Sequence, residues 1–157
     1  MWTDRDETRG GTLIVDVGRL AEYLKRRIPR IGGTVIIDTH YSELLPPELV
    51  DAVFVLRLDP CLLWKRLEAR GWPKEKIREN VEAEIVGVCS AEARSAFREK
   101  VCDIDVSGMS AEEVAEKILL ILGNGGCEAV DWIDLLGPEV LDVLVQGSSC
   151  TPFRVRS

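Results

Sequence analysis

The stretch that most constrains the fold is GGTVIIDTHYSELLP, residues 32–46. After the glycine pair, residues 34–37 form a short β-branched run typical of a strand buried on both faces, and Asp38 ends it. In parallel α/β sheets ligands bind beyond the carboxyl ends of the strands, so Asp38 and His40 would lie where such folds carry out chemistry. A carboxylate there can hold Mg²⁺. The alternative is that Asp38 only caps the following turn.

Two further runs have strand composition. Residues 52–58 read AVFVLRL and are closed by Asp59, and residues 101–106 read VCDIDV. Short, mostly apolar runs of this kind are typical of strands that helices cover on both faces. Together with residues 34–37, they predict three strands.

Helical patterns alternate with these runs. Asp16 is well placed as the N-cap of a helix over residues 17–27, and Pro60 starts a helix that Gly71 ends. One long helix is expected over residues 74–97. Its buried side is expected to carry Ile77, Val81, Ile85, Val88 and Cys89. The alternation of strands and helices predicts an α/β fold.

Charge and hydropathy exclude several classes of protein. The 157 residues carry a formal charge of −7, which argues against a generally adhesive nucleic-acid or membrane surface. No apolar run approaches the roughly 20 residues of a membrane span, and the polar start MWTDRDETRGG is unlike a signal peptide. We therefore expect a cytoplasmic protein with neither DNA nor a membrane as a partner.

The cysteines predict no metal site. The five are scattered, with no C-x-x-C spacing, at Cys61, Cys89, Cys102, Cys127 and Cys150. An odd number without metal-ligand spacing predicts reduced structural thiols.

A dense basic patch stands out in this acidic chain. Arg66 and Arg70 are four residues apart and share a helix face, and Lys74, Lys76 and Arg78 follow in the next turn. Such a patch between two helices suits a mobile lid that closes on phosphates, because arginine stabilises phosphoryl charge. The alternative is that these charges solvate helix ends and pair with nearby glutamates.

The order of these segments resembles one family closely. VIIDTHYSELLP, AVFVLRLDPCLLWKRLEARGWPKEKIRENVEAEI and SAEEVAEKI are similar to the small adenylate kinase-like enzymes of archaea and eukaryotes, also called adenylate kinase isoenzyme 6. The resemblance runs from about residue 6 to residue 122. It implies an α/β fold of the P-loop NTPase, nucleoside monophosphate kinase-like type, in which helices flank a parallel sheet.

The resemblance also implies an activity and roles for particular residues. The activity is phosphoryl transfer from ATP to AMP, with a possible ATPase side activity and a link to small ribosomal subunit and rRNA maturation through a small-subunit ribosomal protein. Asp38 matches the Walker-B acid that holds Mg²⁺, and His40 matches a histidine that places the attacking group. Arg70 matches an ATP-contacting arginine of a lid over residues 69–79. Arg66 and Arg78 are added on charge and placement.

One departure from the family is as informative as the match. Relatives begin with a strand and a phosphate loop ending in Gly-Lys-Ser/Thr, but none of the 13 glycines here is followed by lysine. In this fold that strand lies mid-sheet, between the strands matched by residues 35–38 and 53–58, and its removal exposes two apolar edges. We expect an in-frame upstream extension of about 50 residues bearing the loop, or a second polypeptide that supplies it. The alternative is an inactive module that binds during ribosome assembly.

The two ends of the chain carry less information. About ten polar residues at the start are expected to fray, and Ser110 with Glu113 forms a capping box that begins a helix. The kinase-like domain is expected to span residues 1–122, and residues 123–157 to form a flexible extension. Within that extension, residues 130–145 could dock an amphipathic element or bind a partner. The side chains expected to dock are Trp132, Leu135 and Leu136.

Overall fold

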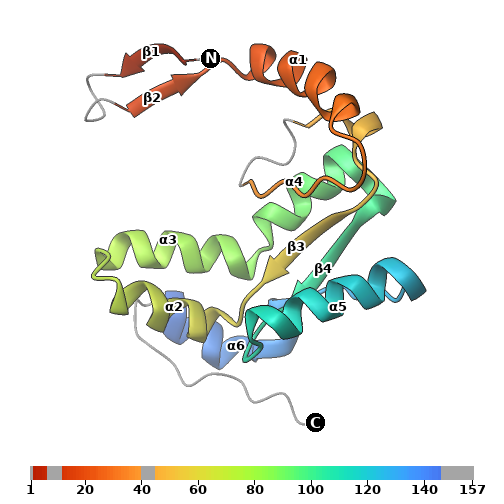
Figure 1. The fold of residues 1–157 in the computed structure, drawn as a ribbon. Helices are drawn as coiled ribbons and strands as arrows, with labels where there is room; N and C mark the ends of the chain where they lie inside the picture. The colour runs from red at the N-terminus through yellow and green to blue at the C-terminus, as the bar shows by residue number, and fades with distance from the viewer. Residues whose placement is uncertain (1, 7–11, 40–44, 146–157) are drawn as a thin grey trace. The chain divides into compact units, whose positions relative to one another are not determined.

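The computed structural model describes residues 2–6, 12–39 and 45–145. The chain divides into two compact units, Met1–Asp51 and Ala52–Ser157, which are described separately (Figure 1).

The second unit is built on two parallel strands. β3 (Val53–Arg57) pairs with β4 (Val101–Asp105) in a continuous register, from Val53 opposite Val101 to Arg57 opposite Asp105. Both strands lie within the predicted runs, and their parallel pairing agrees with the expected fold class. Helices occupy the connection between them, as a parallel pair requires a long crossover.

Local capping signals explain where the helices of the second unit begin. Asp59 accepts hydrogen bonds from the amides of Cys61 (2.7 Å) and Leu62 (3.2 Å) at the start of α2 (Pro60–Ala69). α5 (Ala111–Asn124) begins with the predicted capping box, in which the Ser110 amide donates to Glu113 at 2.7 Å. Both helices therefore begin where the sequence predicts.

The helix predicted over residues 74–97 is two helices, α3 (Lys74–Ile85) and α4 (Val88–Phe97). Gly87 breaks it with a φ of +68°, and a Cβ there would lie 3.3 Å from Nη1 of Arg57. A glycine at positive φ is a local helix terminator, and the lack of a Cβ at Gly87 leaves room for this guanidinium. The break also changes the helical phase, so the predicted burial of Val88 and Cys89 is wrong, since both are exposed.

The apolar core of the second unit joins α2, α3 and α6 (Trp132–Val145), which lie together in Figure 1. Ile77, Val81 and Ile85 are buried as predicted. Trp132 and Leu136 of α6 are also buried, whereas Leu135 is 48% exposed because it lies on the other side of the helix. The core is completed by Cys61, Trp64, Leu67 and Leu144. The expected domain boundary at residue 122 stays a prediction.

The first unit consists of a hairpin and a helix. β1 (Trp2–Asp6) pairs antiparallel with β2 (Thr12–Val15), so the expectation that the first ten residues fray is wrong for residues 2–6. Asp16 caps α1 (Val17–Arg27) as predicted, accepting from the Arg19 amide at 2.9 Å. The short 3-10 helices η2 (Ile28–Arg30) and η4 (Pro47–Leu49) follow, and η5 (Arg98–Lys100) lies in the second unit.

The strand predicted at residues 34–37 is absent. This segment is irregular, with Ile36 91% exposed and Ile37 39% exposed. A strand forms only with a neighbour to bond, and no strand of the described residues pairs with this segment. Its composition therefore favours a strand, but no strand in the described part of the chain pairs with it.

The prediction that the cysteines are all reduced thiols is also wrong. Cys102 of β4 and Cys127 form a disulfide with a Cα–Cα distance of 5.3 Å. Their separation of 25 residues gave no indication of this proximity. Cys89 is free and exposed. Of the helices described, none is both long enough and apolar enough to cross a membrane.

Candidate functional site

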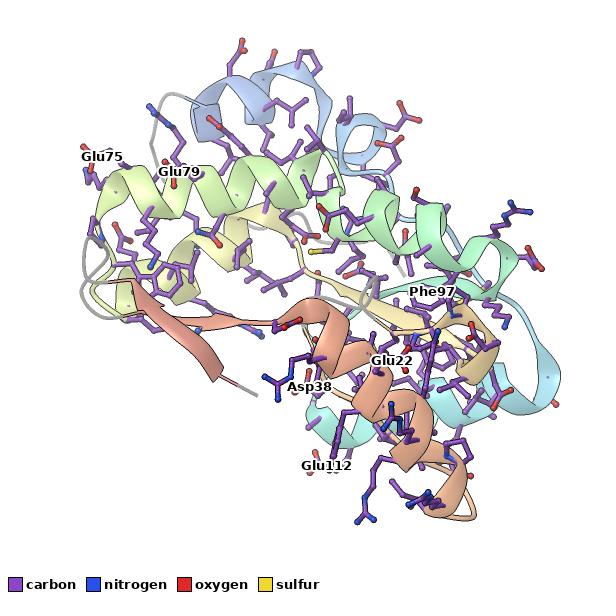
Figure 2. All side chains as sticks on the ribbon, turned by 90° about the horizontal axis from the view of Figure 1, so that it is seen from above. Glu22, Asp38, Glu75, Glu79, Phe97 and Glu112 are labelled. Atoms are coloured by element: carbon purple, nitrogen blue, oxygen red, sulfur yellow. A yellow bond between two sulfur atoms is a disulfide. The ribbon has the colours of Figure 1, made fainter. Side chains whose placement is uncertain are left out.

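Asp38 lies in the irregular segment of the first unit and is exposed (labelled in Figure 2). No ion pair or hydrogen bond joins its carboxylate to another described residue, so both oxygens are accessible to a ligand. The turn that Asp38 might alternatively cap falls in residues 40–44, outside the described part of the chain. His40 lies there too, and its role stays a prediction.

The described surroundings of Asp38 contain no metal cage made by the protein alone. No group of three or more His, Cys, Asp or Glu side chains able to hold a metal occurs among the described residues, so a protein-only cage is not present there. Mg²⁺ commonly uses one or two carboxylates, with water and substrate phosphates as its other ligands. A single accessible carboxylate such as Asp38 is therefore compatible with Mg²⁺ that arrives with a nucleotide.

The predicted lid arginines lie on one helix–turn–helix of the second unit. Arg66 is in the last turn of α2, Arg70 is its C-cap, and Arg78 is in α3. All three side chains are exposed. Gly71 makes the turn possible with a φ of +73°, and its amide donates to the carbonyl of Glu68 at 2.9 Å.

An aromatic residue fixes the turn between α2 and α3. The Trp72 amide donates to the carbonyl of Leu67 at 3.3 Å, and the indole packs against the apolar core. Nζ of Lys76 lies 4.3 Å from the centroid of the Trp72 ring, a cation–π distance. The turn thus presents its basic side chains from an ordered base.

The alternative that the basic patch merely pairs with glutamates holds for one arginine. Nε of Arg78 lies 3.6 Å from Oε1 of Glu82. Arg66 and Arg70 form no ion pair with any residue in the described ranges. Glu75 and Glu79, labelled on α3 in Figure 2, are exposed. Arg66 and Arg70 therefore remain available to an anionic ligand.

A buried ionic cluster, which the sequence did not predict, joins β3 and β4 to α3 and α4. Arg57 of β3 is 2% exposed, and its Nε donates to Oε1 of Glu84 at 2.8 Å. Its Nη1 lies 3.6 Å from Oδ2 of Asp103, which is 3% exposed in β4. The available signal was a charged residue inside each apolar run, because a buried charge requires a partner.

Further donors complete the buried cluster. Ser90 donates its hydroxyl to Oδ1 of Asp103 at 2.9 Å, and Nη2 of Arg94 donates to Oδ2 at 2.9 Å. Nη1 of Arg57 also donates to the carbonyl of Val130 at 3.0 Å, and the indole of Trp132 donates to Glu84 at 2.8 Å. No buried side-chain nitrogen or oxygen among the described residues lacks a partner. The polar atoms of the cluster therefore bond to one another and to the backbone, as expected for a structural role.

The structure thus brings Arg66, Arg70 and Arg78 onto one element. Asp38 belongs to the other unit, so a site that combines Asp38 with Arg70 stays a prediction.

Comparison with known proteins identifies the family. The family described as AAA domain matches residues 2–87. A protein of Saccharolobus islandicus named "Putative adenylate kinase" is 40% identical over 134 residues, covering 85% of this chain and 67% of the relative. One of the same name from Thermococcus onnurineus is 40% identical over 132 residues, covering 84% of this chain and 69% of the relative.

A eukaryotic relative extends the comparison. The "Adenylate kinase isoenzyme 6 homolog" of Schizosaccharomyces pombe is 41% identical over 107 residues, covering 68% of this chain and 59% of the relative. The AAA-domain match, over residues 2–87, includes both the Asp38 segment and the α2–α3 helix–turn–helix. The chain therefore belongs to the adenylate kinase isoenzyme 6 family of P-loop nucleotide kinases.

Proposed function

We propose that this chain carries the metal-binding acid and the lid of an adenylate kinase, and that it transfers the γ-phosphoryl group of ATP to AMP. The supporting observation is the α2–α3 helix–turn–helix, which leaves Arg66 and Arg70 exposed and without ion pairs among the described residues. Unpaired arginines on an ordered turn suit the recognition of phosphate oxygens. Family membership supplies the nucleotide as the ligand class.

Each residue has a distinct part in the proposed reaction. Mg²⁺ bound with ATP would neutralise charge on the phosphates, and Asp38 would hold its water shell. Arg70 and Arg66 would bind phosphate oxygens and stabilise the charge that develops during transfer. Arg78 would contribute once it exchanges Glu82 for the ligand, and His40 would place the attacking group. A bond forms between the γ-phosphorus and an oxygen of AMP as the bond to the β-phosphate oxygen breaks, so two ADP molecules result.

The proposal concerns the chain together with a phosphate loop. Backbone amides and a lysine of such a loop surround the phosphates in P-loop enzymes, and the 157 residues contain no Gly-Lys pair. The experiment therefore compares the printed chain with a fusion in which a strand and a Gly-Lys-Ser/Thr loop precede residue 1. ADP formation from ATP and AMP is measured for both.

The expected result is turnover by the fusion that falls about 100-fold or more in Asp38→Ala and in Arg70→Ala, since each removes transition-state charge stabilisation. Lys65→Ala serves as the matched control, because Lys65 is an exposed cation on the same helix α2 and should leave turnover unchanged. A folded fusion that neither binds ATP nor forms ADP would contradict the proposal.

A second candidate function does not require phosphoryl transfer. The 157 residues contain no Gly-Lys pair, and they could act as a cytoplasmic binding module in small ribosomal subunit assembly, where the partner is a small-subunit ribosomal protein or rRNA. Co-purification of the printed chain with small ribosomal subunit precursors, unaffected by Asp38→Ala, would favour this function. Loss of co-purification in Asp38→Ala would instead connect binding to the nucleotide site.

A further inference from the structure

Glu84 accepts hydrogen bonds from three different segments of the chain. Its Oε1 accepts from Nε of Arg57 at 2.8 Å, from the amide of Leu58 at 3.2 Å and from the indole of Trp132 at 2.8 Å. Its backbone carbonyl accepts from Nη2 of Arg57 at 2.6 Å. The side chain of Glu84 is only 17% exposed. One carboxylate thus joins α3 to the carboxyl end of β3 and to the start of α6.

Glu84 lies at the opposite end of α3 from the lid, so its contacts fix the direction of the helix that carries the lid. Glu84 is in the last turn of α3, whereas the lid residues 74–79 form its first turns. A helix of this length is a rod of about 18 Å, so a change of direction at one end displaces the other. Two hydrogen bonds from Arg57 and one from Leu58 fix the Glu84 end at the strand tip.

Residues 127–130, which precede α6, are anchored to the sheet. Cys127 is disulfide-bonded to Cys102 of β4, and Glu128 forms a β-bridge with Asp103. The carbonyl of Val130 accepts from Arg57 at 3.0 Å. Trp132, which follows, packs with α2 and α3 in the apolar core. The segment before α6 is therefore attached to β3 and β4, and α6, which is kinked at Gly137, packs against both lid-bearing helices.

We propose that Glu84 and Trp132 are positioning residues that set the orientation of the lid through α3. This inference rests on the proposed function for the identity of the lid, and on the contacts of the second unit for the coupling. The Trp132–Glu84 hydrogen bond makes the C-terminal helix α6 a restraint on the lid. Both residues would act through α3.

Hydrogen exchange on the printed chain tests the coupling without any nucleotide. Trp132→Phe removes the indole donor and keeps an aromatic ring in the core. We expect exchange of the hydrogen-bonded lid amides of Trp72 and Ile77 to accelerate about tenfold, as the loss of one charge-assisted hydrogen bond allows. The indole ¹H–¹⁵N signal of Trp72 should shift as well. Leu135→Ala, an exposed position on the same helix, is the control and should change neither.

A purely local role of Trp132 predicts something different. Acceleration confined to α6 and the last turn of α3, with lid exchange and the Trp72 signal unchanged, would overturn the proposal. If Trp132→Phe does not fold, Glu84→Gln provides the same test, because it keeps the side-chain shape while weakening the bond to Arg57. Should both fail to fold, exchange of the unaltered chain in low urea decides: the lid amides and the Trp132 indole should open together, and independent opening contradicts the coupling.

The outcome is separable from that of the proposed function. An inactive fusion with coupled lid exchange would reject the kinase proposal and keep the positioning role. An active fusion with uncoupled exchange would do the reverse.

Discussion

The two units of this chain differ in how they bury their apolar residues. In the second unit, α2, α3 and α6 enclose side chains such as Trp64 and Ile77, each 1% exposed, and a fully bonded ionic cluster lies beside them. In the first unit, the described Leu, Ile and Val side chains are half-buried at best, with Ile36 91% exposed and Ile31 50% exposed. The comparison teaches that strand-like composition is not sufficient for burial, because a run of residues must also find a partner.

The largest expected effect tests the ionic cluster of the second unit. Arg57→Met should lower the free energy of unfolding by about 3–5 kcal/mol, because it leaves Glu84 and Asp103 buried without their common cation. Urea denaturation followed by circular dichroism measures the change. Arg66→Met, at an exposed and unpaired position, should change it by about 0.5 kcal/mol or less. Equal changes in the free energy of unfolding would show that the buried Arg57 contributes no more to stability than the exposed Arg66.

The next effect compares one isoleucine from each unit. Ile77→Ala should cost about 2–5 kcal/mol, since its side chain is 1% exposed in the core. Ile36→Ala should cost about 0.5 kcal/mol or less, since its side chain is 91% exposed. Thermal and urea unfolding of both variants measures this difference. A cost for Ile36→Ala close to that of Ile77→Ala would break the comparison between the units.

A smaller effect concerns the break between α3 and α4. Gly87→Ala and Gly71→Ala both place a side chain at positive φ, which costs about 1–2 kcal/mol. Only at Gly87 does the new Cβ also meet Arg57, at 3.3 Å from Nη1, whereas nothing lies within 4 Å at Gly71. The unfolding free energy should therefore fall further for Gly87→Ala. An equal fall would mean that Arg57 moves aside without cost.

The smallest effect concerns the reactivity of the free thiol. Partial burial, and then the carboxylates of Glu92 and Glu84, raise the pKa of Cys89 above its ordinary value. A raised pKa leaves less thiolate at pH 8, so alkylation by iodoacetamide should be slower than in the urea-unfolded chain. The difference should vanish once the pH exceeds the folded-state pKa. Faster alkylation in the folded chain at pH 8 would contradict this assignment.

Many of the correct fold predictions depend on signals between residues that are close in sequence. The cap at Asp16, the proline at the start of α2 and the Ser110–Glu113 capping box act within one helical turn, so sequence alone placed these helix starts correctly. Two of the three segments that carry the family resemblance, residues 52–85 and 110–118, contain such helix starts. The arginines at 66, 70 and 78 lie on one helix–turn–helix for the same reason.

Some errors are local, such as the hairpin of β1 and β2 and the exposed Leu135, and the others involve partners distant in sequence. Arg57 packs against Gly87, 30 positions later, and Cys102 forms a disulfide with Cys127, 25 positions later. Residues 34–37 do not form the predicted strand because no strand among the described residues pairs with them. The relation between Asp38 and Arg70 is of the same kind, since it depends on how two units meet. It therefore requires a direct measurement.

That measurement uses a paramagnetic ion in place of Mg²⁺. Mn²⁺ with ATP is added to the ¹⁵N-labelled loop-bearing fusion, and amide signals are followed for residues 36–39 and 69–72. If Asp38 and Arg70 act on the same phosphates, both segments lose intensity together, and Asp38→Ala abolishes the loss in both. Broadening of one segment alone, or of both unaffected by Asp38→Ala, would contradict a shared nucleotide site.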